Sequence, residues 1–331
     1  MLANFAWMNP DSGIWPPQGI GIALPKYSKI EPMKTRDHLI DDLLTLAFAE
    51  DVGDGDATTL STIPADEMGR QQLIVKEEGI LAGVEVARKV FEKFDPELKM
   101  TVSITDGAHV KPGDVAFVVE GRVRSLLQTE RIMLNIMQRM SGVATMTHKY
   151  QSRLDGLKTR VLDTRKTTPG MRLLEKEAVK IGGGSNHRIG LFDMILIKDN
   201  HVDFAGGIPQ AVQAAKDWCA ANGKNLQIEL EVRNTDEINQ ALQAGVDRIM
   251  LDNFTPERTL EAVRHIRAYK APEAQLASDP HCHNGEDVEI ESSGGITIDT
   301  LRAYGECGVD FISVGALTHS VKGLDMSFKA C

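Results

Sequence analysis

The chain has 331 residues, of which 42% are hydrophobic and 25% charged, and its formal net charge at pH 7 is −10. These values are typical of a globular protein with about two domains. The acidic balance and the lack of a long basic run argue against a nucleic-acid partner, because nucleic-acid binding needs a basic surface for the phosphates.

The cysteines and the apolar runs indicate the cellular compartment. None of the four cysteines, Cys219, Cys282, Cys307 and Cys331, forms a C-x-x-C pair, so neither a zinc site nor a redox motif is indicated. Widely spaced thiols in a long chain favour a reducing cytoplasm over a disulfide scaffold. The apolar run at residues 19–24 is too short for a membrane span, and no membrane association is expected.

The first half of the chain shows no regular alternation of elements. Residues 1–32 are predicted to be a loosely structured extension, or a region upstream of a functional start at Met33. The patterns that follow predict helices at 37–50 and 84–94, strands at 72–76, 99–105 and 116–120, and a turn at 109–113. This mixture predicts a small α+β domain over residues 33–142. Its last helix, 125–140, is apolar all round and is expected to join two layers.

Regular alternation begins after residue 142. Apolar strands are predicted at 160–162, 194–197, 228–232, 248–251, 288–291 and 311–314, and helices at 208–221, 235–244, 256–269 and 298–307. Near-continuous apolar strands between helices indicate a parallel sheet, and the six units over residues 143–316 are enough for a closed or nearly closed α/β barrel, though fewer than the usual eight. The polar stretch 270–287 is predicted to be an exposed insertion, and a metal site at its His281, Cys282 and His283 is not favoured.

The residues that follow the barrel strands carry the chemistry, because active sites of such barrels lie at the carboxyl ends of the strands. The predicted strands end in Asp163-Thr164-Arg165-Lys166, Lys198-Asp199-Asn200-His201, Glu231, Asp252-Asn253, Ser292-Ser293-Gly294-Gly295 and Gly315. Gly294, Gly295 and Gly315 precede helices in the last two units, where phosphate sites recur. The glycine-rich segment 182–188 (GGGSNHR) matches no nucleotide-binding motif and alone indicates only a flexible turn.

Basic residues gather in the same region. Residues 160–201 hold eight Lys or Arg against five Asp or Glu, and Arg165, Lys166, Arg188 and Lys198 stand at strand ends or beside the glycine-rich segment. Arg offers a two-pronged donor to carboxylate or phosphate and Lys a point charge, so the mixture indicates an anionic substrate. Glu231 and Asp252 would hold Mg²⁺ on a diphosphate or stabilise a cationic sugar, or would pair with Lys198 or Arg165 in the empty protein.

Nine segments match, in order, the motifs of one enzyme family: EDVGDGDATT (50–59), ERIMLNIMQRMSGVATMT (130–147), DTRKTTPG (163–170), GGGSNHR (182–188), LIKDNH (196–201), IELEV (228–232), IMLDN (249–253), ESSGGI (291–296) and SVGALTHS (313–320). The chain resembles nicotinate-nucleotide pyrophosphorylase (carboxylating), also called quinolinate phosphoribosyltransferase. It departs from the family at Lys176-Glu177, where Lys-Tyr is common, which puts a local packing contact in doubt.

The resemblance implies a small α+β domain, an incomplete α/β barrel, and a last segment, 317–331, that returns to the first domain. It implies dimers, or hexamers built from them, in which the partner's first domain completes each barrel. The reaction implied joins quinolinate to phosphoribosyl diphosphate, with magnesium, and yields nicotinate mononucleotide, diphosphate and carbon dioxide for NAD biosynthesis.

The resemblance also implies roles for single residues. Arg131 would reach across the dimer interface to the dicarboxylate, which Arg165, His187, Arg188 and Lys198 would hold from the other side. Lys166, beside Thr164, would meet the diphosphate or ribose, and Glu231 and Asp252 would face the ribose hydroxyls and the magnesium. The 5′-phosphate would lie on Ser293, Gly294, Gly295, Val314, Gly315 and Ala316. Lys166, Glu231 and Asp252 are the expected catalytic residues.

Three other functions fit parts of the pattern. A Schiff-base lyase would use Lys166 or Lys198 as a nucleophile. A transferase acting on nicotinate would need fewer basic side chains. A phosphate-binding barrel without catalysis would give no reason for Glu231 and Asp252.

Overall fold

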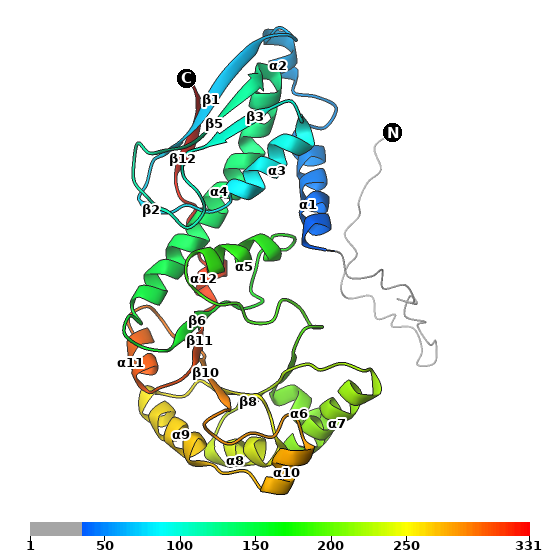
Figure 1. The fold of residues 1–331 in the computed structure, drawn as a ribbon, viewed down its shortest axis with the longest axis vertical. Helices are drawn as coiled ribbons and strands as arrows, with labels where there is room; N and C mark the ends of the chain where they lie inside the picture. Colours follow the sequence, from blue (N-terminus) through cyan, green and yellow to red (C-terminus); the bar gives the residue numbers. More distant parts are fainter. Residues whose placement is uncertain (1–34) are drawn as a thin grey trace, which may run out of the picture.

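The computed structural model describes residues 35–331, and the predicted extension at 1–32 lies outside them (Figure 1). The first part of the molecule is an antiparallel sheet in the order β12-β1-β5-β3, with helices packed on it and a small β2-β4 pair beside it. Its elements are α1 (Arg36–Asp51), α2 (Ala57–Thr62), β1 (Met68–Val75), β2 (Gly79–Ile80), α3 (Val84–Phe94), β3 (Lys99–Val102), β4 (His109–Val110), β5 (Val115–Arg122) and β12 (Met326–Ala330).

Helix α4 (Val123–Ser152) joins the two parts of the molecule and is longer than predicted. Gly142 does not end the helix. The glycine is instead required because another segment of the chain packs closely against α4 at this position. A Cβ there would lie 2.3 Å from the backbone oxygen of Lys322, so only a glycine lets the segment before β12 pack on α4. The predicted domain boundary at residues 142 and 143 therefore falls inside a continuous helix.

The second part is a six-stranded parallel sheet in the order β6-β11-β10-β9-β8-β7, covered by helices. Its strands are β6 (Arg160–Leu162), β7 (Ile195–Ile197), β8 (Ile228–Val232), β9 (Arg248–Asp252), β10 (Glu289–Ser293) and β11 (Phe311–Ser313). Its helices are α5 (Arg172–Ile181), α6 (Asp199–Ala205), α7 (Ile208–Ala221), α8 (Thr235–Ala244), α9 (Pro256–Ala268), α10 (Glu273–Ser278), α11 (Leu301–Glu306) and α12 (Ala316–His319). The predicted incomplete α/β barrel with a smaller α+β domain is confirmed.

The barrel stays open between β6 and β7, the two outer strands of the sheet. These strands are consecutive in the chain, and the segment that joins them holds α5 and the glycine-rich segment 182–188. Leu162 of β6 forms an isolated parallel bridge with Ser185. The glycine-rich segment therefore occupies the edge of β6 where a further strand would otherwise pair. The opening thus lies next to the basic residues that the sequence singled out.

The prediction of an exposed insertion at 270–287 holds for most of the segment, including α10, and is wrong only at its few buried residues. Residues 273–278 form α10, while His281 and Cys282 are buried. The burial follows from Asp247, whose carboxylate oxygens lie 2.7 Å from His281 Nδ1 and 3.0 Å from His283 Nε2. At the chain end, β12 pairs antiparallel with β1 and so adds a strand to the first sheet. In this pairing Gln71 lies opposite Ala330, and Val75 lies opposite Met326.

Within residues 35–331, no helix is both long and apolar enough to cross a membrane.

Candidate active site

Two cavities, of about 360 and 560 Å³, open at the carboxyl ends of the barrel strands. Five residues belong to the walls of both, so the cavities form one continuous cleft; they are Thr164, Lys166, Lys198, Ser293 and Ser313. The smaller cavity also has Arg165, His187, Arg188, Leu196, Met250 and Glu291 in its wall. The larger adds the remaining predicted barrel residues, which are Glu231, Asp252, Gly294, Gly295, Val314, Gly315 and Ala316. The structure therefore brings all predicted site residues of the barrel into one cleft.

The smaller cavity has a cationic rim. Within residues 35–331, no carboxylate oxygen lies within ion-pair distance of Arg165, Lys166 or Arg188. Burial lowers the pKa of Arg188, and repulsion from Arg165 lowers it further. Glu229 and Asp193 partly offset this lowering, but neither carboxylate lies within ion-pair distance of Arg188. The two neighbouring guanidinium groups at the rim can therefore still pair with an anion that enters the cavity.

A buried charge pair positions the segment that carries His187 and Arg188. Asp163, directly after β6, accepts hydrogen bonds from the backbone N–H of His187 at 2.9 Å and from the side-chain amide of Asn186. Lys176 on α5 pairs with the Asp163 carboxylate and donates to the backbone oxygen of His187 at 3.0 Å. Both main-chain polar groups of His187 are thus held from the core. The sequence did not reveal this pairing, because it joins residues on three separate elements.

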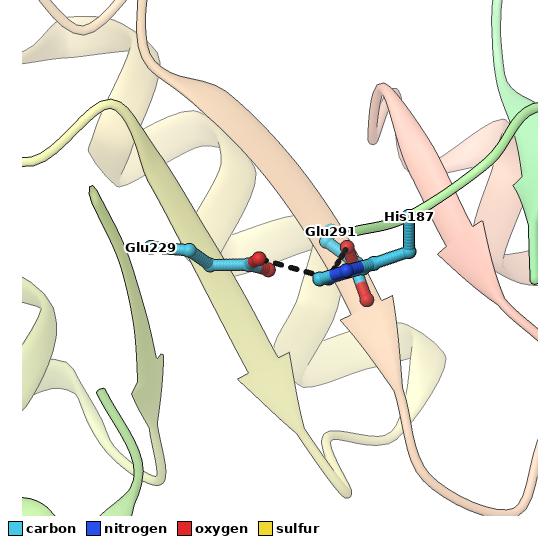
Figure 2. Close-up of side chains that lie close together, drawn as sticks. All are labelled: His187, Glu229 and Glu291. Atoms are coloured by element: carbon cyan, nitrogen blue, oxygen red, sulfur yellow. Dashed lines mark ion pairs between the residues drawn. The ribbon is translucent and has the colours of Figure 1, made fainter. Parts of the chain in front are cut away.

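Three buried side chains, His187, Glu229 and Glu291, point toward one another (Figure 2) and form what we call the floor cluster. Of the three, His187 and Glu291 belong to the wall of the smaller cavity. His187 Nε2 lies 2.9 Å from Glu229 Oε2 and 3.5 Å from Glu291 Oε2. Burial raises the pKa of Glu229 to about 7, and burial followed by the charge of Glu229 raises that of Glu291 to about 8. Burial lowers the pKa of His187. All three groups are therefore biased towards their neutral forms.

The two glutamates were missed by the sequence analysis, although a signal existed. Side chains two residues apart on a strand point to the same face. Glu229 stands two residues before Glu231 on β8, and Glu291 two residues before Ser293 on β10. Because Glu231 and Ser293 face the cleft, Glu229 and Glu291 could be expected to face the barrel interior as well.

The floor cluster has three groups that commonly bind metals, with donor atoms all within 4.8 Å of one another. The protonation of the histidine speaks against a metal ion. His187 Nδ1 accepts a hydrogen bond from the backbone N–H of Arg188 at 2.7 Å, so the proton of the neutral ring sits on Nε2. A protonated Nε2 has no lone pair for a cation. The cluster is therefore a site of buried acids and not of metal ligands.

The larger cavity combines carboxylates with backbone amides. Lys198 Nζ lies 2.6 Å from Glu231 Oε2, which is the alternative pairing that the sequence left open for the empty protein. Asp252 accepts a hydrogen bond from the side-chain amide of Asn253 at 2.8 Å. Glu231 and Asp252 end neighbouring strands, and their oxygens are the ligand type that Mg²⁺ prefers, so the donor set fits that ion.

Glycine is needed at residue 294 for a steric reason. Its φ is +98°, and a Cβ there would lie 2.2 Å from Asn253 Oδ1. In the part of the chain that the structure describes, the backbone N–H groups of Gly294 and Gly295 have no acceptor. Donors of this kind at a strand end suit a phosphate.

Arg131 is the predicted site residue that the structure does not place in the cleft. It lies on α4, its side chain is exposed, and it belongs to the wall of neither cavity. The walls of both cavities come entirely from residues 164–319 of the barrel. In one copy of the chain, the first domain therefore contributes nothing to the cleft.

Comparison with known proteins agrees with this geometry. A model of the quinolinate phosphoribosyl transferase N-terminal domain matches residues 56–141, and a model of its C-terminal domain matches residues 143–329. The chain is 40% identical, over 91% of its length and 85% of the relative, to the chloroplastic nicotinate-nucleotide pyrophosphorylase (carboxylating) of Arabidopsis thaliana. It is 40% identical to the probable enzyme of that name from Bacillus subtilis, over 88% and 93% of the two chains.

Solved structures give the same result. The nicotinate-nucleotide pyrophosphorylase from Francisella tularensis superposes with a TM-score of 0.79 at 39% identity, over 90% of this chain and 98% of that one. The pyrophosphorylase of the same name from Pyrococcus furiosus has a TM-score of 0.60 at 15% identity, which shows a shared fold.

Proposed function

The chain belongs to the quinolinate phosphoribosyltransferase family, and on this premise we propose that its cleft joins quinolinate to phosphoribosyl diphosphate in two adjoining subsites. The enzyme is a nicotinate-nucleotide pyrophosphorylase (carboxylating), a transferase of NAD biosynthesis. The observation that carries the assignment of the subsites is the division of the cleft. One cavity has unpaired guanidinium groups at its rim, and the other has carboxylates and free amides.

The smaller cavity is the quinolinate subsite. Arg165, Arg188 and Lys198 supply the cations for two carboxylates, and the unsatisfied charge of the two arginines is relieved when the dianion enters. His187 Nδ1 already accepts a hydrogen bond from the backbone N–H of Arg188. His187 therefore contributes to this subsite as part of its wall. Clamping both carboxylates orients the ring nitrogen towards the neighbouring cavity, which lowers the entropic part of the barrier.

The larger cavity is the phosphoribosyl diphosphate subsite. Lys166, which borders both cavities, lies where the bond to the leaving diphosphate breaks, and its charge stabilises that group. Glu231 and Asp252 would hold Mg²⁺, which supplies positive charge to the diphosphate, and would face the sugar as it becomes cationic. The amides of Gly294, Gly295, Gly315 and Ala316, with Ser293 and Val314 beside them, would receive the 5′-phosphate.

The active enzyme is a homodimer, or a larger assembly of such dimers, in which Arg131 of one subunit enters the quinolinate subsite of the other. Two observations support this. Arg131 is exposed and remote from the cleft of its own chain. Large apolar side chains are exposed on α1 and on the loop after Arg188, namely Leu39, Leu46, Ile189, Leu191 and Phe192. Such an apolar face next to a charged cleft is typical of a protein interface.

The state of the thiols supports a cytoplasmic location. All four cysteines are free, and Cys219, Cys282 and Cys307 are buried. This pattern favours a reducing compartment and supports work in the cytoplasm.

The direct test is an assay of the purified chain with quinolinate, phosphoribosyl diphosphate and Mg²⁺ in which diphosphate and carbon dioxide are measured. Both products are expected in equal amounts, together with nicotinate mononucleotide. Nicotinate in place of quinolinate is expected to give no product, because it leaves one guanidinium group unpaired. A folded chain that released neither diphosphate nor carbon dioxide would refute the proposal, and covalent trapping of substrate by borohydride would favour a lyase that uses Lys166 or Lys198.

A further inference from the structure

The reaction needs one group that the cations and magnesium ligands do not supply. When the carboxylate beside the ring nitrogen leaves as carbon dioxide, the electron pair of the broken C–C bond stays on the ring carbon. That carbon must then take up a proton. Lysine and arginine side chains hold their protons tightly near neutral pH and are weak acids for this step. A suitable donor must lie in the wall of the quinolinate subsite.

Glu291 occupies this position. Its side chain is 0% exposed, yet it forms part of the wall of the smaller cavity, below the rim of Arg165 and Arg188. Each element packed around it presents a polar group: His187 of the segment before β7, Glu229 of β8, Arg248 of β9 and Ser313 of β11. Glu291 thus meets both the substrate cavity and the buried polar cluster.

The surroundings of Glu291 do not support a negative charge there. Glu229 is a second carboxyl group in the same buried cluster, and two such neighbours cannot both be ionised. Arg248 is a weak counter-ion for Glu291, because it stands 3.5 Å from Oε2 while binding Glu289 at 2.7 Å. Glu291 Oε1 has no hydrogen-bond partner within the described residues. A carboxylate in this wall would also repel the dianion that the rim attracts.

We propose that Glu291 is a neutral carboxylic acid that protonates the ring carbon from which carbon dioxide leaves. This role rests on the proposed function of the cleft. In the step, the bond between the ring carbon and its carboxylate breaks, carbon dioxide departs, and the electron pair forms a C–H bond with the Glu291 proton. Glu291 is left as a carboxylate. It regains a proton from solvent when the nucleotide dissociates and the cavity opens to water.

The test separates the two chemical steps in a rapid-quench experiment that measures diphosphate and carbon dioxide in the first turnover. Glu291→Gln keeps the shape of the side chain and removes the acid. We expect diphosphate to form at nearly the wild-type rate, while carbon dioxide release slows by about 10²-fold or more and the dicarboxylated nucleotide accumulates. Glu289→Gln is the matched control. It removes a carboxylate next to the same Arg248, two residues away on the same strand, outside the cleft.

Three results would overturn the proposal: an equal loss of both products in Glu291→Gln, no loss at all, or the same selective loss of carbon dioxide release in Glu289→Gln. A wild-type chain that formed no diphosphate would instead refute the proposed function, so the two failures are distinguishable. Infrared spectra of the wild type and of Glu291→Gln test the acid directly. We expect the carbonyl stretch of a protonated carboxyl group to persist in the wild type above about pH 7, the value to which the pKa of Glu229 is raised, and to be lost there in Glu291→Gln. Its absence from the wild type there would also overturn the proposal.

Discussion

Lys176 Nζ donates a hydrogen bond to the backbone carbonyl oxygen of His187, 3.0 Å away inside the barrel. The same amine pairs with Asp163, whose carboxylate accepts the His187 backbone N–H. The neighbouring Glu177, which stands where relatives were expected to have tyrosine, instead forms a surface ion pair with Arg36 at 2.6 Å. The departure from the family pattern therefore changes a contact with α1 and leaves the support of the proposed quinolinate subsite intact.

Lys176→Met should weaken quinolinate binding and stability together. The substitution leaves the buried Asp163 carboxyl group without its cation, and breaking a buried pair in this way typically costs about 3–5 kcal/mol. The segment with His187 and Arg188 then loses one of its main-chain anchors, so KM for quinolinate should increase more than KM for phosphoribosyl diphosphate. Urea denaturation and steady-state kinetics measure the two effects.

Lys180→Met is the control for this prediction, because Lys180 lies on the same helix and is exposed. It should leave stability and both KM values close to those of the wild type. Equal increases of both KM values in Lys176→Met would mean that the pair supports the whole barrel and not the quinolinate subsite.

Much of the fold was predictable from the sequence, because hydrophobic periodicity reports elements directly. The predicted bounds of α3, α7, α8, β6 and β8 agree with the structure. The positions after the strands located the cleft, since the strands of a parallel barrel all end at one face. Pairings between distant elements were not predictable. Asp163 with Lys176 and Glu229 with Glu291 depend on which side chains share the barrel interior, and a pattern along one strand does not report its neighbours.

Glu231→Gln should separate catalysis from quinolinate binding. Lys198 and Glu231 are 2.6 Å apart in the empty cleft, with side chains 45% and 11% exposed. Removing the carboxylate frees Lys198 for the substrate but removes negative charge from beside the sugar. We therefore expect kcat to fall by about 10²-fold while the affinity for quinolinate is retained or increased. Glu237 on α8 forms an ion pair with Arg233, which precedes that helix, and both residues lie outside the two cavities. Glu237→Gln should therefore leave kcat unchanged. A loss of quinolinate affinity in Glu231→Gln would contradict the prediction.

The proposed sharing of the active site between two subunits predicts rescue between two inactive variants. Arg131→Ala should abolish quinolinate binding, and Lys166→Ala should abolish turnover. If Arg131 acts in the partner's cleft, mixed dimers contain one site with both residues intact. Dissociating and re-forming an equal mixture should restore roughly a quarter of the wild-type activity, because half of the dimers are hybrids with one good site. An unchanged, inactive mixture whose subunits demonstrably exchange would place Arg131 outside the neighbouring site.

Asp95 should make stability depend on pH in the acid range. Its buried carboxylate accepts hydrogen bonds from Arg122 and Ser125, and the Arg122 bonds, as the largest effect, lower its pKa from 3.8 to about 2. A lowered pKa means that the charged form contributes stability above about pH 4 and that this contribution is lost as the pH falls through about 2. Asp95→Asn should therefore cost about 2 kcal/mol at pH 7 and progressively less as the pH decreases towards 2. Urea titrations at a series of pH values test this, and a cost that did not change with pH would rule out an electrostatic origin.

Glu291 should have the opposite effect on stability. Its pKa rises from 4.5 to about 8 on folding, so between these values the folded chain holds a proton that the unfolded chain releases. Stability must then fall as the pH increases through this window, because the unfolded state binds fewer protons. Glu291→Gln removes the titrating group, so the variant should not show this loss of stability. The melting temperature of the variant minus that of the wild type should therefore be larger near pH 8 than near pH 5. Glu289→Gln, at the solvent-accessible end of the same strand, should show no such widening difference. A melting-temperature difference that stayed constant over the whole range would mean that Glu291 is ionised in the folded protein, and the proton for the ring carbon would then have to come from another group.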